Sequence, residues 1–182
     1  FFRSHGLVAA DSQEAAQYAA ECAAACERTV VLAEALRDQP DYGFRRALLA
    51  AQQAVRIGMI AADHPRARER RHEGLATLAQ LRGKVQQGWW DDEVWVRGNL
   101  AAAGDRCEAG DLEGALAHLQ PLLSGTMVAV EALDVADAFA RCQRLALGIG
   151  NQPSAKACEE NALAMLRAAI GGGITRAHLM AL

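Results

Sequence analysis

Apolar residues recur every three to four positions along most of the chain, which is the spacing of one face of an α-helix. The stretch 112–123 is typical, because Leu112, Ala115, Leu116 and Leu119 share a face there. No run of five or six residues alternates convincingly between apolar and polar side chains, so no strand is predicted. The spacing predicts main helices over 12–36, 44–62, 66–85, 92–108, 112–123, 127–147 and 154–170, and a short terminal helix over 175–182.

The predicted helices are separated by residues that typically end or begin a helix. Gly110 tolerates the left-handed backbone conformation that ends a helix, and Asp111 is a favourable N-cap for the next helix. Asp91 and Thr126 are predicted to cap the helices that follow them. Because the loops are short, we expect antiparallel neighbours, with the second helix paired with the third, the fourth with the fifth and the sixth with the seventh. The first helix then packs as a leading cap.

Length and composition agree with one helical domain. The 182 residues suffice for a core of their own, and they are rich in Ala, Leu, Arg, Glu and Gln, which favour helices. We therefore predict an all-α fold over 1–182, made of about seven helices in stacked antiparallel hairpins. Because the chain begins with Phe1 and not with Met, we expect it to be a piece of a longer protein.

The fourth and fifth predicted helices resemble a tetratricopeptide repeat, a helical hairpin of about 34 residues. Ala115-x3-Leu119 follows the Ala-x3-Phe pattern of the second helix of that family, and Gly110-Asp111 stands where such repeats turn. The first helix departs from the family. The places of its usual Trp, Leu, Gly and Tyr are taken by Asn99, Ala102, Ala103 and Arg106.

The same small-x3-Leu spacing occurs in the other two predicted pairs, at Gly74-x3-Leu78 and Ala162-x3-Leu166. Ala115 lies 41 residues after Gly74 and 47 residues before Ala162. The resemblance thus implies a degenerate tetratricopeptide-like array with long helices. An ordinary helical hairpin outside the family stays open, as does the choice between an open arc and a compact array.

The segment 161–179, NALAMLRAAIGGGITRAHL, is similar to the closing helix of the repeat tails of large bacterial Ser/Thr kinases and related signalling proteins. Those tails carry a segment of the type ALLRxAVxxGxxDxxHL. Arg176 stands where that pattern has Asp, and His178-Leu179 come one residue early. Positions that fall on the pattern are Ala164, Leu166, Arg167, Ala169, Ile170 and Gly173. The resemblance implies a non-catalytic tail, because the chain has no kinase motif.

Charge and cysteine content narrow the possible partners. With 19 basic and 22 acidic residues the net charge is −3, so neither nucleic acid nor an anionic membrane is an expected partner. The basic run 66–71 is interrupted by Ala67 and Glu69 and is interpreted as a solvated helix face. Five scattered cysteines suggest no disulfide framework. No apolar run reaches about 18 residues, so no membrane helix is expected, and the predicted location is the cytoplasm.

No catalytic, metal or cofactor site is predicted. The chain contains neither a nucleophile elbow nor a HExxH motif, and it has one Glu-x-x-His spacing where di-iron bundles need two. Cys22 and Cys26 lie four residues apart on one predicted helix, so both thiols point the same way. Two buried thiols are the simpler interpretation. A closed bundle that binds a metal or small ligand through Cys22 and Cys26 is kept as an alternative.

Binding of a partner protein is the predicted function. Trp89, Trp90 and Trp95 form an aromatic cluster, and tryptophan is enriched at interface hot spots. They either plug the seam between the third and fourth helices or contact a ligand. In the tetratricopeptide family the first helix of each pair lines the concave face, which implies contacts from Arg45, Gln52, Arg56, Trp95, Asn99, Arg106, Arg141 and Arg144. Such a face suits an acidic or carboxylate-bearing segment. A purely structural domain of a larger signalling enzyme is the other alternative.

Overall fold

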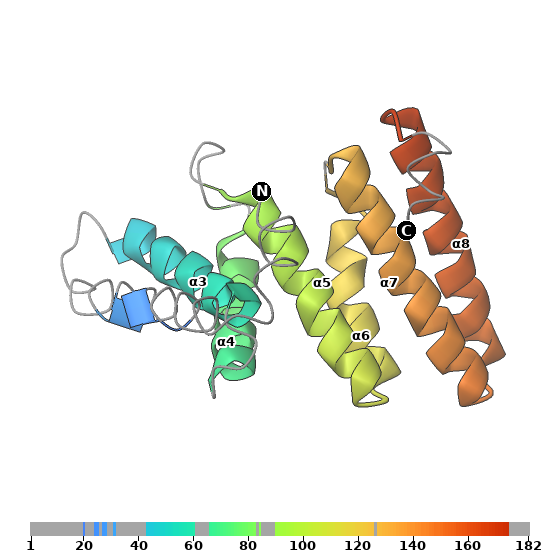
Figure 1. Ribbon diagram of the computed structural model, residues 1–182, viewed down its shortest axis with the longest axis horizontal. Helices are drawn as coiled ribbons and strands as arrows, with labels where there is room; N and C mark the ends of the chain where they lie inside the picture. The colour runs from blue at the N-terminus through green and yellow to red at the C-terminus, as the bar shows by residue number, and fades with distance from the viewer. Residues whose placement is uncertain are drawn as a thin grey trace. The chain divides into compact units, whose positions relative to one another are not determined.

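The computed structural model describes residues 20, 24–25, 27–28, 31, 43–60, 66–82, 84, 90–125 and 127–174. Within these residues the secondary structure is helical and no strand occurs, which confirms the all-α prediction. The described α-helices, drawn in Figure 1, are α3 (Gly43–Ile60), α4 (Ala67–Leu81), α5 (Asp92–Glu108), α6 (Leu112–Leu119), α7 (Ala129–Gly148) and α8 (Gln152–Gly171). A 3₁₀ turn, η2 (Gln120–Leu122), follows α6.

The six helices predicted between 44 and 170 are present, with some changed ends. Helix α7 begins at Ala129 and not after Thr126, because the Glu131 side chain accepts a hydrogen bond from the Val128 N–H at 3.1 Å. Helix α6 ends at Leu119 and is followed by a 3₁₀ turn that contains Pro121. Thr126 itself and the predicted helix over 175–182 lie outside the described residues, as does most of the helix predicted over 12–36.

The chain divides into two compact units, Phe1–Gly98 and Asn99–Leu182. The boundary falls inside α5, which is one continuous helix. The single domain over 1–182 stays a prediction.

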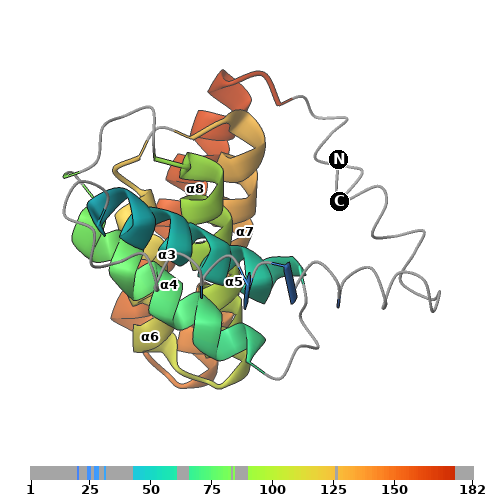
Figure 2. The same cartoon turned by 90° about the vertical axis from the view of Figure 1, so that its left-hand side faces the viewer.

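In the first unit, α3 and α4 pack against each other (Figure 2). Glycines of both helices lie at the contact. A Cβ added to Gly74 of α4 would stand 2.6 Å from the Ala51 carbonyl oxygen and 2.8 Å from a methyl of Val55. A Cβ added to Gly58 of α3 would stand 2.6 Å from the Ala67 carbonyl oxygen. Both distances are far shorter than van der Waals contact, so the two helix backbones approach too closely for any side chain here.

A buried arginine ties the same two helices together. Arg71 of α4 is 6% exposed, and its Nη1 donates to the Gly58 carbonyl oxygen at 2.7 Å. This carbonyl lies in the last turn of α3, where the helix leaves carbonyl oxygens without partners inside the helix. The guanidinium supplies such a partner, and its positive charge also complements the negative end of the helix dipole.

In the second unit, α7 and α8 pack as a hairpin, and α6 packs on α7 (Figure 1). Apolar residues that the 3.6-residue spacing placed on one face of α6 are buried, including Leu112, Ala115 and Leu119. The largest fully buried side chains of this unit belong to Leu119, Leu122, Val135, Phe139, Cys142 and Cys158. The amphipathic pattern therefore located the buried face of α6. On α7 it was wrong about Val130, which was marked as inward and is 52% exposed, and it missed Val135 and Phe139, which are buried.

One corner geometry occurs twice in this unit, once after α5 and once after α7. Gly110 and Gly150, which end these two helices, both have a φ of 74°. The N–H of Asp111 donates to the Arg106 carbonyl, and the N–H of Asn151 donates to the Ala146 carbonyl, each at 2.8 Å. This is the backbone pattern of a glycine-terminated helix.

The side chain after each glycine then begins the next helix. Oδ1 of Asp111 accepts from the Gly114 N–H at 2.8 Å, and Oδ1 of Asn151 accepts from the Ser154 N–H at 3.1 Å. The Asp111 cap was predicted, whereas 148–153 was expected to be a loop with α8 starting at Ser154. When the two hairpins are aligned on their corners, Ala155, and not Ala162, stands at the place of Ala115.

Substituting alanine for glycine should have opposite effects at two helix positions. Gly74→Ala should lower the free energy of unfolding by about 1–2 kcal/mol, because overpacking against the α3 backbone outweighs the gain in helix propensity. Gly104→Ala on α5 should raise it by up to about 1 kcal/mol, since its added Cβ meets nothing within 4 Å. Urea unfolding followed by circular dichroism measures both. Stabilisation by Gly74→Ala would contradict the close approach of α3 and α4.

Candidate functional site

Three of the residues predicted to contact a partner are buried. The exposed fractions are 5% for Gln52, 5% for Trp95 and 3% for Asn99. In the second unit the Asn99 amide oxygen accepts from Nδ1 of His118 at 3.1 Å, which joins α5 to α6. A partner would reach these side chains only after a rearrangement, and their role as contacts stays a prediction.

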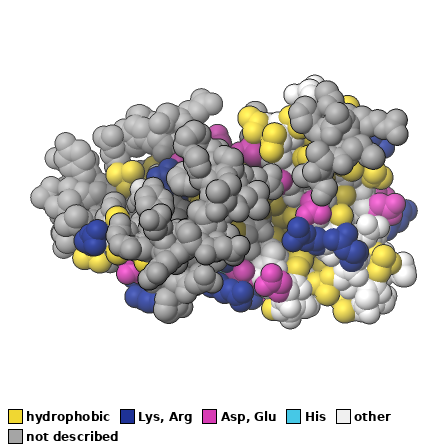
Figure 3. All heavy atoms as spheres, viewed as in Figure 1, with side chains coloured by type: hydrophobic (Ala, Val, Ile, Leu, Met, Phe, Trp, Pro, Cys, Tyr) yellow, Lys and Arg dark blue, Asp and Glu magenta, His cyan; other side chains and the backbone are white. Residues whose placement is uncertain are grey.

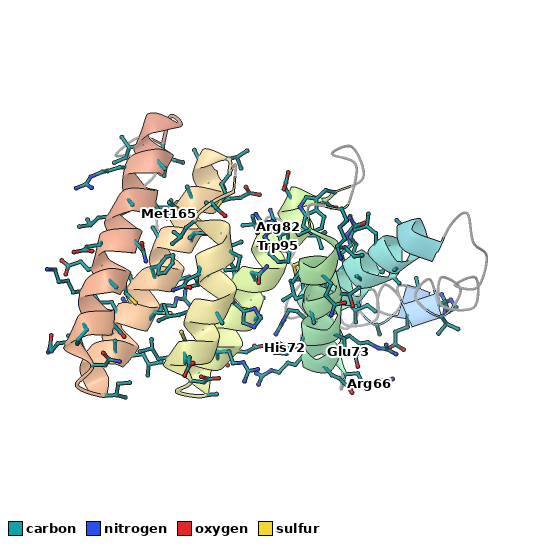
Figure 4. All side chains as sticks on the ribbon, turned by 180° about the vertical axis from the view of Figure 1, so that it is seen from behind. Arg66, His72, Glu73, Arg82, Trp95 and Met165 are labelled. Atoms are coloured by element: carbon teal, nitrogen blue, oxygen red, sulfur yellow. The ribbon has the colours of Figure 1, made fainter. Side chains whose placement is uncertain are left out.

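The aromatic cluster lies at the start of α5, in the first unit. The ring centroids of Trp90 and Trp95 are 5.6 Å apart, with an angle of 53° between the ring planes. Arg82 lies over the Trp95 ring, with its Cζ 5.0 Å from the centroid, which is a cation–π contact (Figure 4). Trp90 is half-buried and Trp95 is buried, so Trp95 acts as a core residue. Trp89 lies outside the described residues.

Three arginines predicted to bind a partner are each paired with a carboxylate of the chain. Arg56 contacts Asp91 at 2.5 Å, Arg141 contacts Asp137 at 2.8 Å, and Arg106 contacts Asp111 at 3.2 Å. The first of these pairs belongs to the first unit and the other two to the second, and all of them are partly exposed. The positive charge expected to attract an acidic segment is therefore partly offset within the chain. The side chain of Arg45, another predicted contact, lies outside the part of the chain that the structure describes.

Asp91 has two tasks at the start of α5. Its Oδ1 accepts from the Val94 N–H at 3.0 Å, which is the predicted N-cap, and its Oδ2 pairs with Arg56 of α3. The Asp91 side chain thus caps the start of α5 and holds that end of α5 beside α3. Together with Arg82, Trp90 and Trp95, it forms a polar and aromatic cluster that positions α5 in the first unit.

Three thiols meet inside the second unit. Sγ of Cys107 on α5 lies 3.5 Å from Sγ of Cys142 on α7, and Cys158 on α8 is buried nearby. Burial raises the pKa of the Cys142 thiol, and its hydrogen bond with Cys107 adds to this effect. Burial likewise raises the pKa of Cys158, with a smaller contribution from Cys107. The two buried thiols therefore stay protonated near neutral pH.

The two corners of the second unit border a cleft of about 720 Å³. The cleft lies over the start of α6 and the turn into α8. Its lining residues are Gly110, Asp111, Leu112, Glu113, Leu116, Ala117, Gln120, Ile149, Asn151 and Ser154. None of the predicted contact residues is among them. The recurrence of Gly110-Asp111 as Gly150-Asn151, a glycine followed by a capping side chain, is the sequence signal that could have located it.

The cleft combines apolar and acidic side chains. Leu116, Ala117 and Ile149 supply apolar surface, and Ile149 is 59% exposed. Asp111 and Glu113 are the acidic members of the lining, which contains no basic residue. Figure 3 shows hydrophobic and charged side chains mixed on the visible face over α7 and α8. An exposed isoleucine beside acidic groups suits a ligand that is both apolar and basic.

Among the described residues, no group of three His, Cys, Asp or Glu side chains is arranged to hold a metal ion. Cys22 and Cys26, the alternative metal site, lie outside the described residues. The described helices also include none that is long and apolar enough to cross a membrane.

Two substitutions of Asp91 should separate the contribution of its N-cap to stability from the contribution of its ion pair. Asp91→Ala removes both and should lower the free energy of unfolding by about 1–2 kcal/mol. Asp91→Asn keeps a side-chain oxygen for the Val94 N–H and should cost less than about 1 kcal/mol, since the pair with Arg56 is partly exposed. Urea unfolding measures both values, and Arg56→Gln is the control that should match Asp91→Asn. Equal losses for the Ala and Asn variants would assign the whole effect to the ion pair.

Comparisons of the chain with protein-family models, with curated proteins and with solved structures find no match.

Proposed function

We propose that the chain is a non-catalytic binding module, and that the cleft between the two corners holds a segment of a partner protein. The observation that carries the proposal is the cleft of about 720 Å³ with the exposed Ile149 on its wall. A ligand that covers this more than half-exposed isoleucine removes apolar surface from water, which favours binding. The function is the protein interaction that the sequence predicts, at a different surface.

The openness of the cleft favours a peptide over an enclosed small molecule. Glu113, Ala117, Gln120 and Ile149 are all exposed, so the lining side chains form a shallow wall and not a closed chamber. Small-molecule sites usually bury most of the ligand surface. A peptide needs only to place one or two side chains in such a cleft while its backbone stays in water.

The charges of the lining select the type of peptide. The carboxylate of Asp111 already caps α6 and pairs with Arg106, so Glu113 is the acidic side chain that remains for a ligand. We therefore propose a segment with an apolar side chain next to Lys or Arg. This differs from the acidic segment expected from the arginines, three of which, Arg56, Arg106 and Arg141, are paired with carboxylates of the chain.

The recurring corner supports a tetratricopeptide-like arrangement as part of the proposal. Two successive helix pairs with the same turn geometry, at Gly110 and at Gly150, are the kind of unit from which helical repeats are built. A place in the tail of a larger signalling protein follows only from the resemblance of 161–179 and is proposed on that ground alone.

A peptide selection with matched isoleucine variants tests the proposal. Peptides from a displayed random library are selected on the immobilised full chain, and the affinity of each selected peptide is measured by fluorescence anisotropy. Ile149→Asp should weaken binding at least about tenfold, since burying an isoleucine contributes about 1.5–3 kcal/mol. Glu113→Gln should weaken it only a few-fold, and mainly at low salt.

Ile170→Asp is the matched control, because Ile170 is also an exposed isoleucine of the second unit, 54% exposed, but does not line the cleft. It should leave the affinity unchanged. Equal losses for Ile149→Asp and Ile170→Asp would place binding elsewhere. A selection that yields no peptide would favour a purely structural domain.

A further inference from the structure

Two cysteines from different helices touch inside the second unit. Cys107 lies in the last turns of α5 and Cys142 lies in the middle of α7, with their sulfur atoms 3.5 Å apart. This is a contact of two thiols, about 1.5 Å longer than a disulfide bond. Cys107 and Cys142 are 35 residues apart in the sequence, so the fold itself brings them together.

The two thiols differ in their access to solvent. Cys142 is fully buried, with an exposed fraction of 0%, whereas Cys107 is half-buried. A small oxidant therefore reaches Cys107 first. Cys142 lies directly behind it, in the position of a second thiol that resolves an oxidised first thiol.

We propose that Cys107 and Cys142 form a peroxide-sensitive oxidation site that closes to an intrachain disulfide between α5 and α7. In the first step the Cys107 thiolate attacks one oxygen of hydrogen peroxide. An S–O bond forms, the O–O bond breaks, and the departing hydroxide takes up a proton to become water. Cys107 is then a sulfenic acid, oxidised by two electrons.

In the second step the sulfur of Cys142 attacks the sulfenic sulfur of Cys107. The S–S bond forms, the S–O bond breaks, and the leaving hydroxide takes the thiol proton of Cys142 as water. One peroxide is thus reduced to two waters while two thiols become one disulfide. The proton leaves the buried thiol during the reaction, so a free thiolate at Cys142 is not required beforehand.

The end of α5 has room for the movement that the bond needs. A Cβ added to Gly104, one turn before Cys107 and close to the same face, would meet nothing within 4 Å. Cys107 also lies close to the glycine corner that ends α5, where the Gly110 N–H donates to the Cys107 carbonyl at 3.0 Å. The last turn of α5 can therefore shift toward α7 while α7 stays packed on α8. Oxidation at this pair does not depend on the proposed binding function.

Tryptic mapping of the oxidised chain tests the proposal directly. The full chain is reduced, treated with hydrogen peroxide, alkylated and digested without reductant. Trypsin cuts after Arg106, Arg141 and Lys156, so Cys107, Cys142 and Cys158 fall on three different peptides, 107–141, 142–144 and 157–167. Replacing Cys22 and Cys26 with serine removes the other two thiols. We expect 107–141 linked to 142–144, in a monomer whose intact mass has fallen by two hydrogens.

Single variants separate the two steps. Cys107→Ser should abolish the link, and Cys142→Ala should stop the reaction at a sulfenic acid on Cys107, which a cyclic dione probe labels. Cys158→Ser is the control and should leave the link intact. Circular dichroism of each variant shows that it is folded. A link between Cys107 and Cys158, a disulfide between two chains, or over-oxidation of Cys107 without any link would overturn the proposal.

Discussion

The corner made of a left-handed glycine and a capping Asp or Asn is the constraint on which the second unit depends. Gly110 and Gly150 reverse the chain at a φ that other residues rarely adopt, and Asp111 and Asn151 begin the next helix at once. Because each corner is only a few residues long, the helices on its two sides must be antiparallel neighbours, as α7 and α8 are. Burial of Ala115, Ala155 and Cys142 follows from that placement, and so does the cleft that the two corners border.

Polar groups in this chain hold helix ends more than they stabilise the core. Arg71 completes the last turn of α3, Asp91 starts α5, and Asp111 starts α6. Caps of this kind contribute about 1 kcal/mol each, whereas partly exposed ion pairs contribute less. The exposed pair between Arg141 and Asp137 therefore says little about stability. Counting arginines on a helix face overestimates the charge that a partner would meet, because the same faces carry the carboxylates that pair with them.

The sequence predicted local features well and tertiary features poorly. The 3.6-residue spacing located the described helices, and the caps at Asp91 and Asp111 followed from residue type. Asn151 was missed because Asn-Gln-Pro was interpreted as a loop, although proline is favoured in the first turn of a helix. Trp95 was left open as either a plug between helices or a ligand contact, and Asn99 was expected to contact a partner; both are buried. Arg82 and His118 contact them from other segments, and helical spacing alone does not specify such contacts.

The cleft could not be predicted from any single segment. Its binding properties depend on which of its polar side chains already have partners within the chain. Asp111 is committed to α6 and to Arg106, so its charge is partly offset at the site. Glu113 lies in the first turn of α6, where the helix dipole stabilises its carboxylate and weakens its attraction for a ligand cation. A rim charge of this kind affects the rate of association and the choice of partner more than affinity. Apolar contact with Ile149 and Leu116 must therefore supply most of the binding free energy, and the acidic side chain decides which apolar segment is accepted.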